Sequence, residues 1–550
     1  MLGVQPPFGR NYGRSVVISQ QGIAATSQVP ASQAAAQILS EGGSAADAAI
    51  AANAVLAVVE PMMNGLGGDL FVLYWEAKTG KLTGLNASGP APSRLSPELV
   101  RSQGIASMQD AGVHAVTVPG AVDGWSKMHL RFGKLPWNRL FRPAIAHAKH
   151  GFPVPEIVQE LWAAPSTVGK LQASPEAARV FLADDTPPQV GDIFRNPDLA
   201  RAFRILADVG PQAFYAGEIA SAILATSQEL GGLINRDDLA SYSAEWVEPI
   251  SIDYRGWRVF ELPPNGQGMA ALEMLNIMET IPADPNGPFS SVEMHKRIEA
   301  MKLAYADAYR YNGDPRSAKV PVDGLLSKAY ARERAEFIDL KRANGNFAPG
   351  RPAGSDTVYL SVVDREGNIA SWIQSIYAGF GSGIVVKGMG FPLQNRGAGF
   401  TLEPDHPNVL AGGKRPFHTI IPGFMERGDQ HIGFGIMGGA NQPLAHAQFV
   451  SNVVDYGMNL QQAMEAPRFF KGAPAGLEVA IEARVPAITL EQLTDMGHVI
   501  ALRPEYSQEM GRGQAILHNS KTRTNYAASD ARADGAAVPE PTTFYDDGDV

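Results

Sequence analysis

The amino-acid sequence predicts a chain that mixes α-helices with antiparallel strands, and three observations support this class. Its 550 residues exceed what one hydrophobic core normally holds, so we expect two domains or one large layered domain. Residues 31–89 have the pattern of two helices followed by a β-hairpin. A second β-hairpin is predicted to begin at Thr357.

The composition is typical of a large folded enzyme. Hydrophobic residues make up 45% of the chain, and 57 Gly and 40 Pro allow many tight turns around a large core. The net charge of -10 is spread without a Lys/Arg cluster, so we expect no nucleic-acid partner. Because the chain has no cysteine, disulfides, thiolate nucleophiles and cysteine-ligated metals are excluded.

Neither the start of the chain nor its most apolar segment indicates export or a membrane. The first 17 residues lack an apolar run of signal-peptide length, so we expect a cytoplasmic location. The apolar run that follows Asp47 contains Asn53 and falls well short of the roughly 20 residues that span a bilayer. It is predicted to be a buried helix, and no membrane partner is expected.

The first elements carry clear start and stop signals. Ser44 followed by Asp47 predicts a capping box at the start of the buried helix, and Pro61 ends it. The helix before it is expected to end at the glycine pair 42–43. Two strands then flank the turn "AKTGK", which completes a helix-helix-hairpin unit.

The middle of the chain, roughly residues 120–350, is predicted to be mostly helical. In one helix four large side chains repeat at spacings of four, three and four, which places them on one core-facing side: Met294, Ile298, Met301 and Tyr305. Residues 340–356 are rich in Gly and Pro and are expected to form an exposed linker. The acidic tail from Ser529 is expected to fray.

The second hairpin can be placed in register from its sequence. The turn "DREGN" follows the alternating strand "TVYLSVV", so a symmetric loop pairs Val363 with Ile369. Counting back along both strands pairs Thr357 with Ser375 on the same face. A one-residue bulge would shift this pairing.

Several common catalytic motifs are missing from the sequence. There is no H-E-x-x-H, no G-x-S-x-G and no G-x-x-x-x-G-K-[ST]. His147 and His150 lack further metal ligands nearby, and "GFGSG" at 379–383 lacks the rest of a dinucleotide fingerprint. We therefore expect neither a metal nor a cofactor.

Thr357 has a chemical role open to it only if the chain is cut. A hydroxyl needs a base to become nucleophilic, and the local sequence supplies neither His nor Lys. Cleavage between Asp356 and Thr357 would free an α-amino group, with a reference pKa near 8, that can take the proton. Gly438 and Gly439 could offer backbone N–H donors to a reacting carbonyl, worth roughly 3 kcal/mol each. A strand threonine is on its own far more often structural than catalytic.

The chain as a whole resembles the gamma-glutamyltranspeptidase family of N-terminal nucleophile hydrolases. The motifs that carry this resemblance follow the family's order: "ILSEGGSAADAAIAANAVLAVVEP", "NGLGGDLFVLYW", "TVPGAVDGW", "DLASYSAEWVEPISIDYRG", "LPPNGQG", "EAMKLAYADAYRYNGDP", "DTVYLSVVDREGNIAS", "GKRPFHTIIP" and "GGANQP". The resemblance implies an α+β fold, a four-layer αββα sandwich, made as a precursor that cuts itself. The large segment would be 1–356 and the small catalytic segment 357–550, together one intertwined unit.

The resemblance also assigns roles to single residues. Thr357 matches the processing site and nucleophile, with Asp356 on the other side of the cut bond. Ser375 matches the hydroxyl that hydrogen-bonds the nucleophile, and Gly438 and Gly439 match the oxyanion glycines. The implied mechanism is attack on an amide carbonyl, an acyl-enzyme, and release to water or an amine.

The sequence departs from the family where the γ-glutamyl group would bind. Ser88 stands in place of the Arg that grips the α-carboxylate, and Gly399 in place of the acid that grips the α-amino group. Losing each charge-assisted partner should cost about 1.5–3 kcal/mol. Tyr377 replaces an amide side chain, and His418 and Thr419 stand where the family has paired serines.

Arg396 remains in the loop where the glutamyl amino group would lie. It either binds a substrate carboxylate or forms a surface salt bridge. The first interpretation resembles the branch of the family that includes cephalosporin acylases.

Three functions follow from these residues. The first is an autoprocessed threonine amidohydrolase or acyltransferase, similar to a gamma-glutamyltransferase or glutathione hydrolase. The second is an acylase on a non-glutamyl dicarboxylic acyl amide such as a glutaryl amide. The third is an uncleaved scaffold that keeps only the fold. The expected partners are a small-molecule amide and the chain's own two fragments, and a homodimer is left open.

Overall fold

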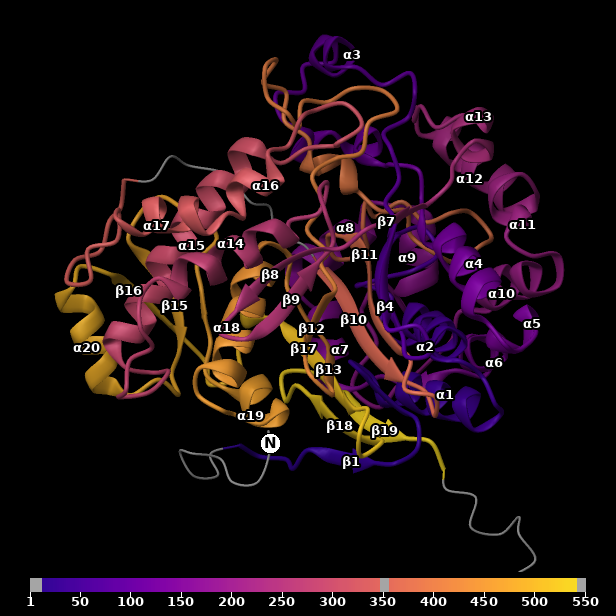
Figure 1. Cartoon of the computed structure of the whole chain (residues 1–550). Helices are drawn as coiled ribbons and strands as arrows, with labels where there is room; N and C mark the ends of the chain where they lie inside the picture. The colour runs from indigo at the N-terminus through magenta and orange to yellow at the C-terminus, as the bar shows by residue number, and fades with distance from the viewer. Residues whose placement is uncertain (1–11, 347–355, 542–550) are drawn as a thin grey trace, which may run out of the picture.

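Two seven-stranded antiparallel sheets pack face to face between layers of helices in the computed structural model (Figure 1). The structure describes residues 12–346 and 356–541. The α+β class and the four-layer αββα arrangement are confirmed. The expected linker lies mostly outside the described residues.

The first sheet has the strand order β1-β18-β17-β13-β12-β9-β8. Its strands are β1 (Val17–Ser19), β18 (Thr524–Ser529), β17 (Arg512–Asn519), β13 (Gln430–Met437), β12 (Gly423–Arg427), β9 (Trp257–Glu261) and β8 (Ile250–Tyr254). The second sheet has the order β19-β2-β10-β11-β3-β4-β7. Its strands are β19 (Ala536–Pro539), β2 (Ile23–Thr26), β10 (Asp356–Val363), β11 (Ile369–Tyr377), β3 (Asp69–Glu76), β4 (Lys81–Ala87) and β7 (Glu245–Val247). Two small sheets pair β14 (Phe469–Phe470), β15 (Glu478–Glu482) and β16 (Val499–Arg503), and β5 (Phe152–Pro153) with β6 (Ile193–Phe194).

One helical layer covers each large sheet. On the second sheet lie α2 (Ala45–Val59), against β10 and β11, and α4 (Ala121–Phe132), against β3 and β4. On the first sheet lie α14 (Gly268–Glu279), α18 (Gln442–Val454) and α19 (Leu460–Glu465), with α15 (Ser291–Tyr311) packed on α14. The remaining helices are α1 (Val29–Ser40), α3 (Pro97–Ser102), α5 (Trp137–Leu140), α6 (Arg142–His150), α7 (Glu156–Trp162), α8 (Pro165–Gln172), α9 (Pro175–Phe181), α10 (Pro197–Val209), α11 (Gln212–Tyr215), α12 (Glu218–Glu229), α13 (Arg236–Ala240), α16 (Val322–Leu325), α17 (Lys328–Ala335) and α20 (Ala487–Asp495).

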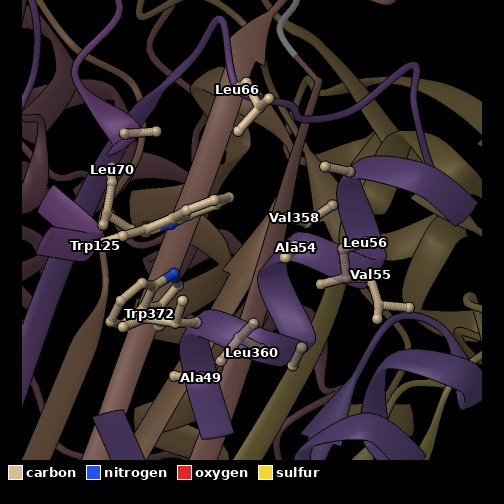
Figure 2. Packing of buried hydrophobic residues seen from close by; sticks show 14 of the residues in the cluster. Ala49, Ala54, Val55, Leu56, Leu66, Leu70, Trp125, Val358, Leu360 and Trp372 are labelled. Carbon is tan, nitrogen blue, oxygen red and sulfur yellow. The ribbon is translucent and has the colours of Figure 1, made fainter. Parts of the chain in front are cut away.

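Helix α2 is the buried helix that the sequence predicts. The Ser44 side chain accepts from the Asp47 N–H, and the Asp47 carboxylate accepts from the Ser44 N–H, which confirms the capping box. Every residue of α2 is buried, and Figure 2 shows its apolar side chains beside those of β10. Its one amide, Asn53, accepts a hydrogen bond of 2.6 Å from the Trp372 indole, so its carbonyl oxygen is satisfied inside the core.

The register of the second hairpin is confirmed up to its first residue. Val363 pairs with Ile369, and the pairing continues to Val358 opposite Gln374. A bulge between Asp356 and Val358 then shifts the ladder, so Asp356 lies opposite Tyr377. The bulge falls at Thr357, the residue on which the functional prediction depends.

One regional prediction is confirmed and one needs correction. The middle of the chain is largely helical, and the predicted face of α15 is buried, but β7, β8 and β9 interrupt the helices. The acidic tail does not fray at Ser529, because β19 pairs with β2 through Pro539. Residues 542–550 lie outside the described part. Within the described residues, no helix is long and apolar enough to cross a bilayer.

Candidate active site around Thr357

The candidate site begins with two hydroxyls at the ends of neighbouring strands. Thr357 is fully buried at the start of β10, and its Oγ1 donates to Ser375 Oγ at 3.2 Å. The same serine oxygen accepts from the Tyr377 N–H and from Arg396 Nη2, each at 2.9 Å. Ser375 therefore joins the predicted nucleophile to the charged side of the site, despite the bulge.

The face of β10 that carries Thr357 packs against β13 in the other sheet. A Cβ on Gly435 would lie 2.4 Å from the Tyr359 ring, and Ser361 Oγ donates to the Gly433 carbonyl at 3.4 Å. A step of two residues back along β10, from Ser361 to Tyr359, thus corresponds to a step of two residues forward along β13, from Gly433 to Gly435. The same step places Thr357 toward the end of β13, where Met437 leads into Gly438.

Gly438 and Gly439 form the turn that follows β13. Their φ angles of 144° and 61° lie in the region that favours glycine. Within the described chain, neither N–H has a hydrogen-bond acceptor. Gln267 Nε2 donates to the Gly439 carbonyl at 2.7 Å and to the Thr419 carbonyl at 2.6 Å. The turn is fixed by its carbonyls, which leaves two adjacent donors available for an oxyanion.

Arg396 lies inside the protein, so its interpretation as a surface salt bridge is wrong. Its side chain is fully buried, Nη1 donates to Thr419 Oγ1 at 2.8 Å, and Cζ lies 4.5 Å from the centroid of the Tyr377 ring. Burial lowers the pKa of Arg396 to about 10, which still leaves it charged at neutral pH. Its Nε has no partner among the described residues. We call Tyr377, Arg396, His418 and Thr419 the acyl cluster.

Asp69 completes the cluster, and sequence reasoning missed it. It lies opposite Ser375 in the pairing of β3 with β11, so both side chains lie on the same sheet face. Its Oδ1 accepts from the N–H groups of Gly89 and Gly120 at 3.0 and 3.2 Å and from Gln394 Nε2 at 2.8 Å. The available signal was a carboxylate at the first position of a strand that is apolar over its next six residues but for the Tyr74 hydroxyl.

His418 is a neutral donor to Asp69. The Ile420 N–H donates to His418 Nδ1 at 3.3 Å, so the ring proton lies on Nε2 and points to Asp69 Oδ2 at 3.1 Å. Burial, with Arg396 and Arg415 nearby, holds the pKa of His418 well below its ordinary value. Burial raises the pKa of Asp69 to about 7, although the charge of Arg396 and the hydrogen bonds that Asp69 accepts oppose the rise.

The two departures from the family have a structural basis. Ser88 is buried, and its Oγ donates to Asn86 Oδ1 at 2.7 Å. The Arg415 guanidinium donates to the Ser88 carbonyl at 3.1 Å and pairs with Glu245 at 2.9 Å. At Gly399, a Cβ would lie 2.8 Å from the Phe417 carbonyl oxygen, so an acidic side chain does not fit without backbone movement.

One other cluster has the composition of a metal site. His295, Glu299 and His498 are buried and bring their ligand atoms within 4.8 Å of one another. However, Lys302 Nζ lies 2.6 Å from Glu299 Oε1, so a cation already neutralises this carboxylate. A divalent metal would have to displace a buried ammonium group, and we assign no metal to the cluster.

Several known proteins are similar to this chain over nearly its whole length. The family model described as Gamma-glutamyltranspeptidase matches residues 31–540. The glutathione hydrolase-like YwrD proenzyme of Bacillus subtilis (strain 168) is 36% identical over 518 residues, 92% of this chain and 96% of that protein. The oxamate amidohydrolase proenzyme of Klebsiella pneumoniae subsp. pneumoniae is 34% identical over 536 residues, 95% of this chain and 99% of that protein. The crystal structure of cephalosporin acylase from Bacillus halodurans matches with a TM-score of 0.90 and 40% identity, covering 98% of this chain and 99% of that one.

Proposed function

The chain belongs to the gamma-glutamyltranspeptidase family, and from this premise we propose that it is a threonine amidohydrolase whose acyl substrates carry a carboxylate. It is an autoprocessed hydrolase of the N-terminal nucleophile fold. The non-enzymatic scaffold is therefore set aside. The roles of single residues given below are our proposal.

Self-cleavage uses the nucleophile and the oxyanion turn together. Thr357 Oγ1 attacks the carbonyl carbon of Asp356, and the Gly438 and Gly439 N–H groups stabilise the oxyanion. The C–N bond breaks as the amine takes a proton, which leaves residue 356 esterified to Thr357. This break frees the α-amino group of Thr357. Water then hydrolyses the ester, which restores the Thr357 hydroxyl and releases residue 356 as a carboxylate. The cut separates 1–356 from 357–550.

The freed amino group makes turnover possible. It accepts the proton of Thr357 Oγ1 as this oxygen attacks the substrate amide, which occupies the place of the former carbonyl of residue 356. The leaving amine takes the proton, and an ester links the acyl group to Thr357. Water releases the acid; an acceptor amine in place of water gives acyl transfer.

Arg396 carries the proposal for the acyl group. Its Nη2 reaches Ser375 Oγ in 2.9 Å, and this oxygen is 3.2 Å from Thr357 Oγ1, so the guanidinium lies within about 6 Å of the nucleophile. A carboxylate on the acyl group would meet a buried cation with an unused Nε–H. The cephalosporin acylase and oxamate amidohydrolase named among its relatives agree with an acyl group other than γ-glutamyl.

A γ-glutamyl group is the second candidate, because relatives are named glutathione hydrolases. Its α-amino group would need an acid, and Gly399 leaves no room for one. Arg396 at the same loop would also repel an ammonium group.

The test compares glutaryl, γ-glutamyl and pentanoyl p-nitroanilides on purified, self-cleaved protein. We expect glutaryl to give the highest kcat/KM of the three. Arg396→Gln should reduce the ratio of glutaryl to pentanoyl kcat/KM about 10- to 100-fold, the loss of one charge-assisted hydrogen bond. A preference for γ-glutamyl, or a ratio that Arg396→Gln leaves unchanged, would contradict the proposal.

A further inference from the structure

We propose that Asp69 sets the affinity of the site for the acyl carboxylate: it opposes the charge of Arg396 and takes up a proton when the anion binds. This inference rests on the proposed function. Asp69 acts through Arg396 and His418 rather than on the reacting atoms, so it is a specificity-determining residue and not a catalytic one.

The position of Asp69 links it to the nucleophile without contact. Thr357, Ser375 and Asp69 follow one another across β10, β11 and β3 on the face that packs against the other sheet. Arg396 reaches the middle hydroxyl of this row. An acyl carboxylate held by Arg396 would therefore lie near Asp69.

The hydrogen bonds of Asp69 hold three parts of the site. They reach Gly89, next to Ser88; Gln394, two residues before Arg396; and His418, next to Thr419. Three donors point at Oδ1 and one at Oδ2. Oδ2 is thus the less occupied oxygen and the natural place for an added proton.

The charges around Asp69 are nearly balanced before a substrate binds. The carboxylate and the Arg396 guanidinium attract each other through space. The other titratable or charged groups that act on Asp69 or on its partner His418 are Tyr215 from α11, Tyr242 after α13, and Arg415. Both phenols stay neutral, since burial raises their pKa well above the ordinary value. Arg415 is paired with Glu245 at 2.9 Å, so the buried Arg396 guanidinium is left to balance the buried Asp69 carboxylate.

A second carboxylate upsets this balance. With Asp69 ionised, two anions share the Arg396 charge in a buried site, where repulsion is poorly screened. A proton on Asp69 removes the repulsion, and its pKa of about 7 in the free protein makes that proton available near neutral pH. Binding of the anion raises this pKa further. The KM for an anionic substrate should therefore rise as the pH rises through about 7.

The experiment measures the ratio of KM for glutaryl p-nitroanilide to KM for pentanoyl p-nitroanilide from pH 6 to pH 9. The two acyl chains differ only in the carboxylate, so titration of the nucleophile affects both. We expect the ratio to rise at least threefold between pH 6 and pH 8 in the wild type. In Asp69→Asn, which keeps the size of the side chain, the ratio should be low and flat.

If Asp69 had only a structural role, Asp69→Asn would raise both KM values together, and the wild-type ratio of the two KM values would not change with pH. That result would overturn the inference. Should Asp69→Asn fail to fold, calorimetry on the wild type gives the answer. Glutarate binding at pH 7 in buffers of different ionisation enthalpy should show proton uptake, and zero uptake would refute the inference. If the anilides show a glutaryl preference with a flat ratio, only the inference fails. If the enzyme shows no preference for the glutaryl anilide at any pH, the proposed function is wrong, and so is the inference that rests on it.

Discussion

At the scale of single residues, the site depends on one oxygen, Ser375 Oγ. It accepts from Thr357, from the Tyr377 N–H and from Arg396. These three donors come from the proposed nucleophile, from the backbone two residues after Ser375 and from the acyl cluster. Ser375 thus sets the position of the nucleophile relative to the group that we propose to bind the substrate.

Ser375→Ala should slow both self-cleavage and turnover. Thr357 Oγ1 would lose its described acceptor, and Arg396 Nη2 would be left buried without that partner, at about 1–3 kcal/mol. We expect kcat/KM for glutaryl p-nitroanilide to fall about 10- to 100-fold, the equivalent of that loss. Initial rates and the time course of cleavage on a denaturing gel measure the two effects.

Ser371→Ala is the matched control, since Ser371 is buried in the same strand and bonded to Tyr359 and the Gly423 carbonyl. It should lower stability without changing kcat/KM by more than about threefold. Equal losses of activity in the two variants would mean that Ser375 has only a structural role.

The sequence predicted Thr357 and Ser375, which contact each other and are close in the chain. It did not predict Asp69, whose hydrogen-bond partners are far away in the chain. Thr357 and Ser375 are joined by a short hairpin, so counting along two strands placed them together. Asp69 receives its hydrogen bonds from Gly89, Gly120, Gln394 and His418, which are spread over three hundred residues. The local sequence shows only a carboxylate at the first position of β3, which does not reveal these distant partners.

At the scale of elements, the turn between β13 and α18 has little room for an added methyl group. A Cβ on Gly438 would lie 3.1 Å from the Gly511 backbone, at a φ of 144°. Gly438→Ala must therefore shift the turn and its N–H donors. We expect self-cleavage and kcat to fall at least 100-fold, the usual loss of an oxyanion donor.

Gly457→Ala controls for backbone strain alone. Gly457 also has a positive φ, 62°, but nothing lies within 4 Å of its Cβ position. This variant should lose about 1 kcal/mol of stability and keep its activity. Thermal unfolding and initial rates of both variants separate strain from catalysis, and an active Gly438→Ala would contradict the oxyanion assignment.

His498, between α20 and β16, should make stability depend on pH. His295 Nε2 donates to the Asp339 carbonyl, so His295 Nδ1 accepts from His498 Nε2 at 2.8 Å. Burial, with Lys302, His295 and Lys471 nearby, lowers the pKa of His498 to about 3. As pH falls below about 6.5, His498 binds a proton in the unfolded chain but stays neutral in the folded chain. His498 therefore lowers the free energy of unfolding at low pH.

His498→Gln can keep the donated hydrogen bond and removes this titration. Its free energy of unfolding relative to wild type should rise by about 2 kcal/mol between pH 7.5 and pH 5. Urea unfolding at both pH values measures the change, with His150→Gln at the exposed end of α6 as the control. A difference that is independent of pH would show that His498 does not titrate on unfolding.

Elements were predictable where their signals are local. The α2 helix carries its own cap and stop, and both hairpins carry their own turns. Strand β19 was missed because its partner, β2, lies about 500 residues earlier, and no local pattern in an Ala-rich segment points there. The four layers came from family resemblance, since periodicity alone does not say which faces pack together.

At the scale of the whole molecule, the two proposed fragments, 1–356 and 357–550, are interleaved rather than side by side. In the first sheet, β1, β8 and β9 precede residue 357, while the other four strands follow it. In the second sheet, β10 and β11 from the small fragment lie between β2 and β3 from the large one. Cutting the bond between Asp356 and Thr357 would therefore detach only the Asp356–Tyr377 pair at the end of β10 and would leave the strand pairs between the fragments in place.

The cleaved protein should behave as a single particle. The two proposed fragments are joined by the strand pairs β1–β18, β10–β2, β11–β3, β12–β9 and β19–β2, and the side chains along β11 are buried. Size-exclusion chromatography should give one peak for the cleaved wild type and for uncleaved Thr357→Ala, at the same volume. Denaturing electrophoresis and intact mass should show two fragments for the first, the smaller beginning at Thr357, and one chain for the second.

The fragments should not fold when made separately. Alone, the large fragment would expose the edges of β2 and β3, and the small fragment would lack the helix α2 that covers β10 and β11. Coexpression of 1–356 with 357–550 should give less active enzyme than the precursor, because the pairing must then form between two chains. Full activity from fragments that were folded apart and then mixed would show that the sheets are not formed jointly, and would contradict the interleaved assembly.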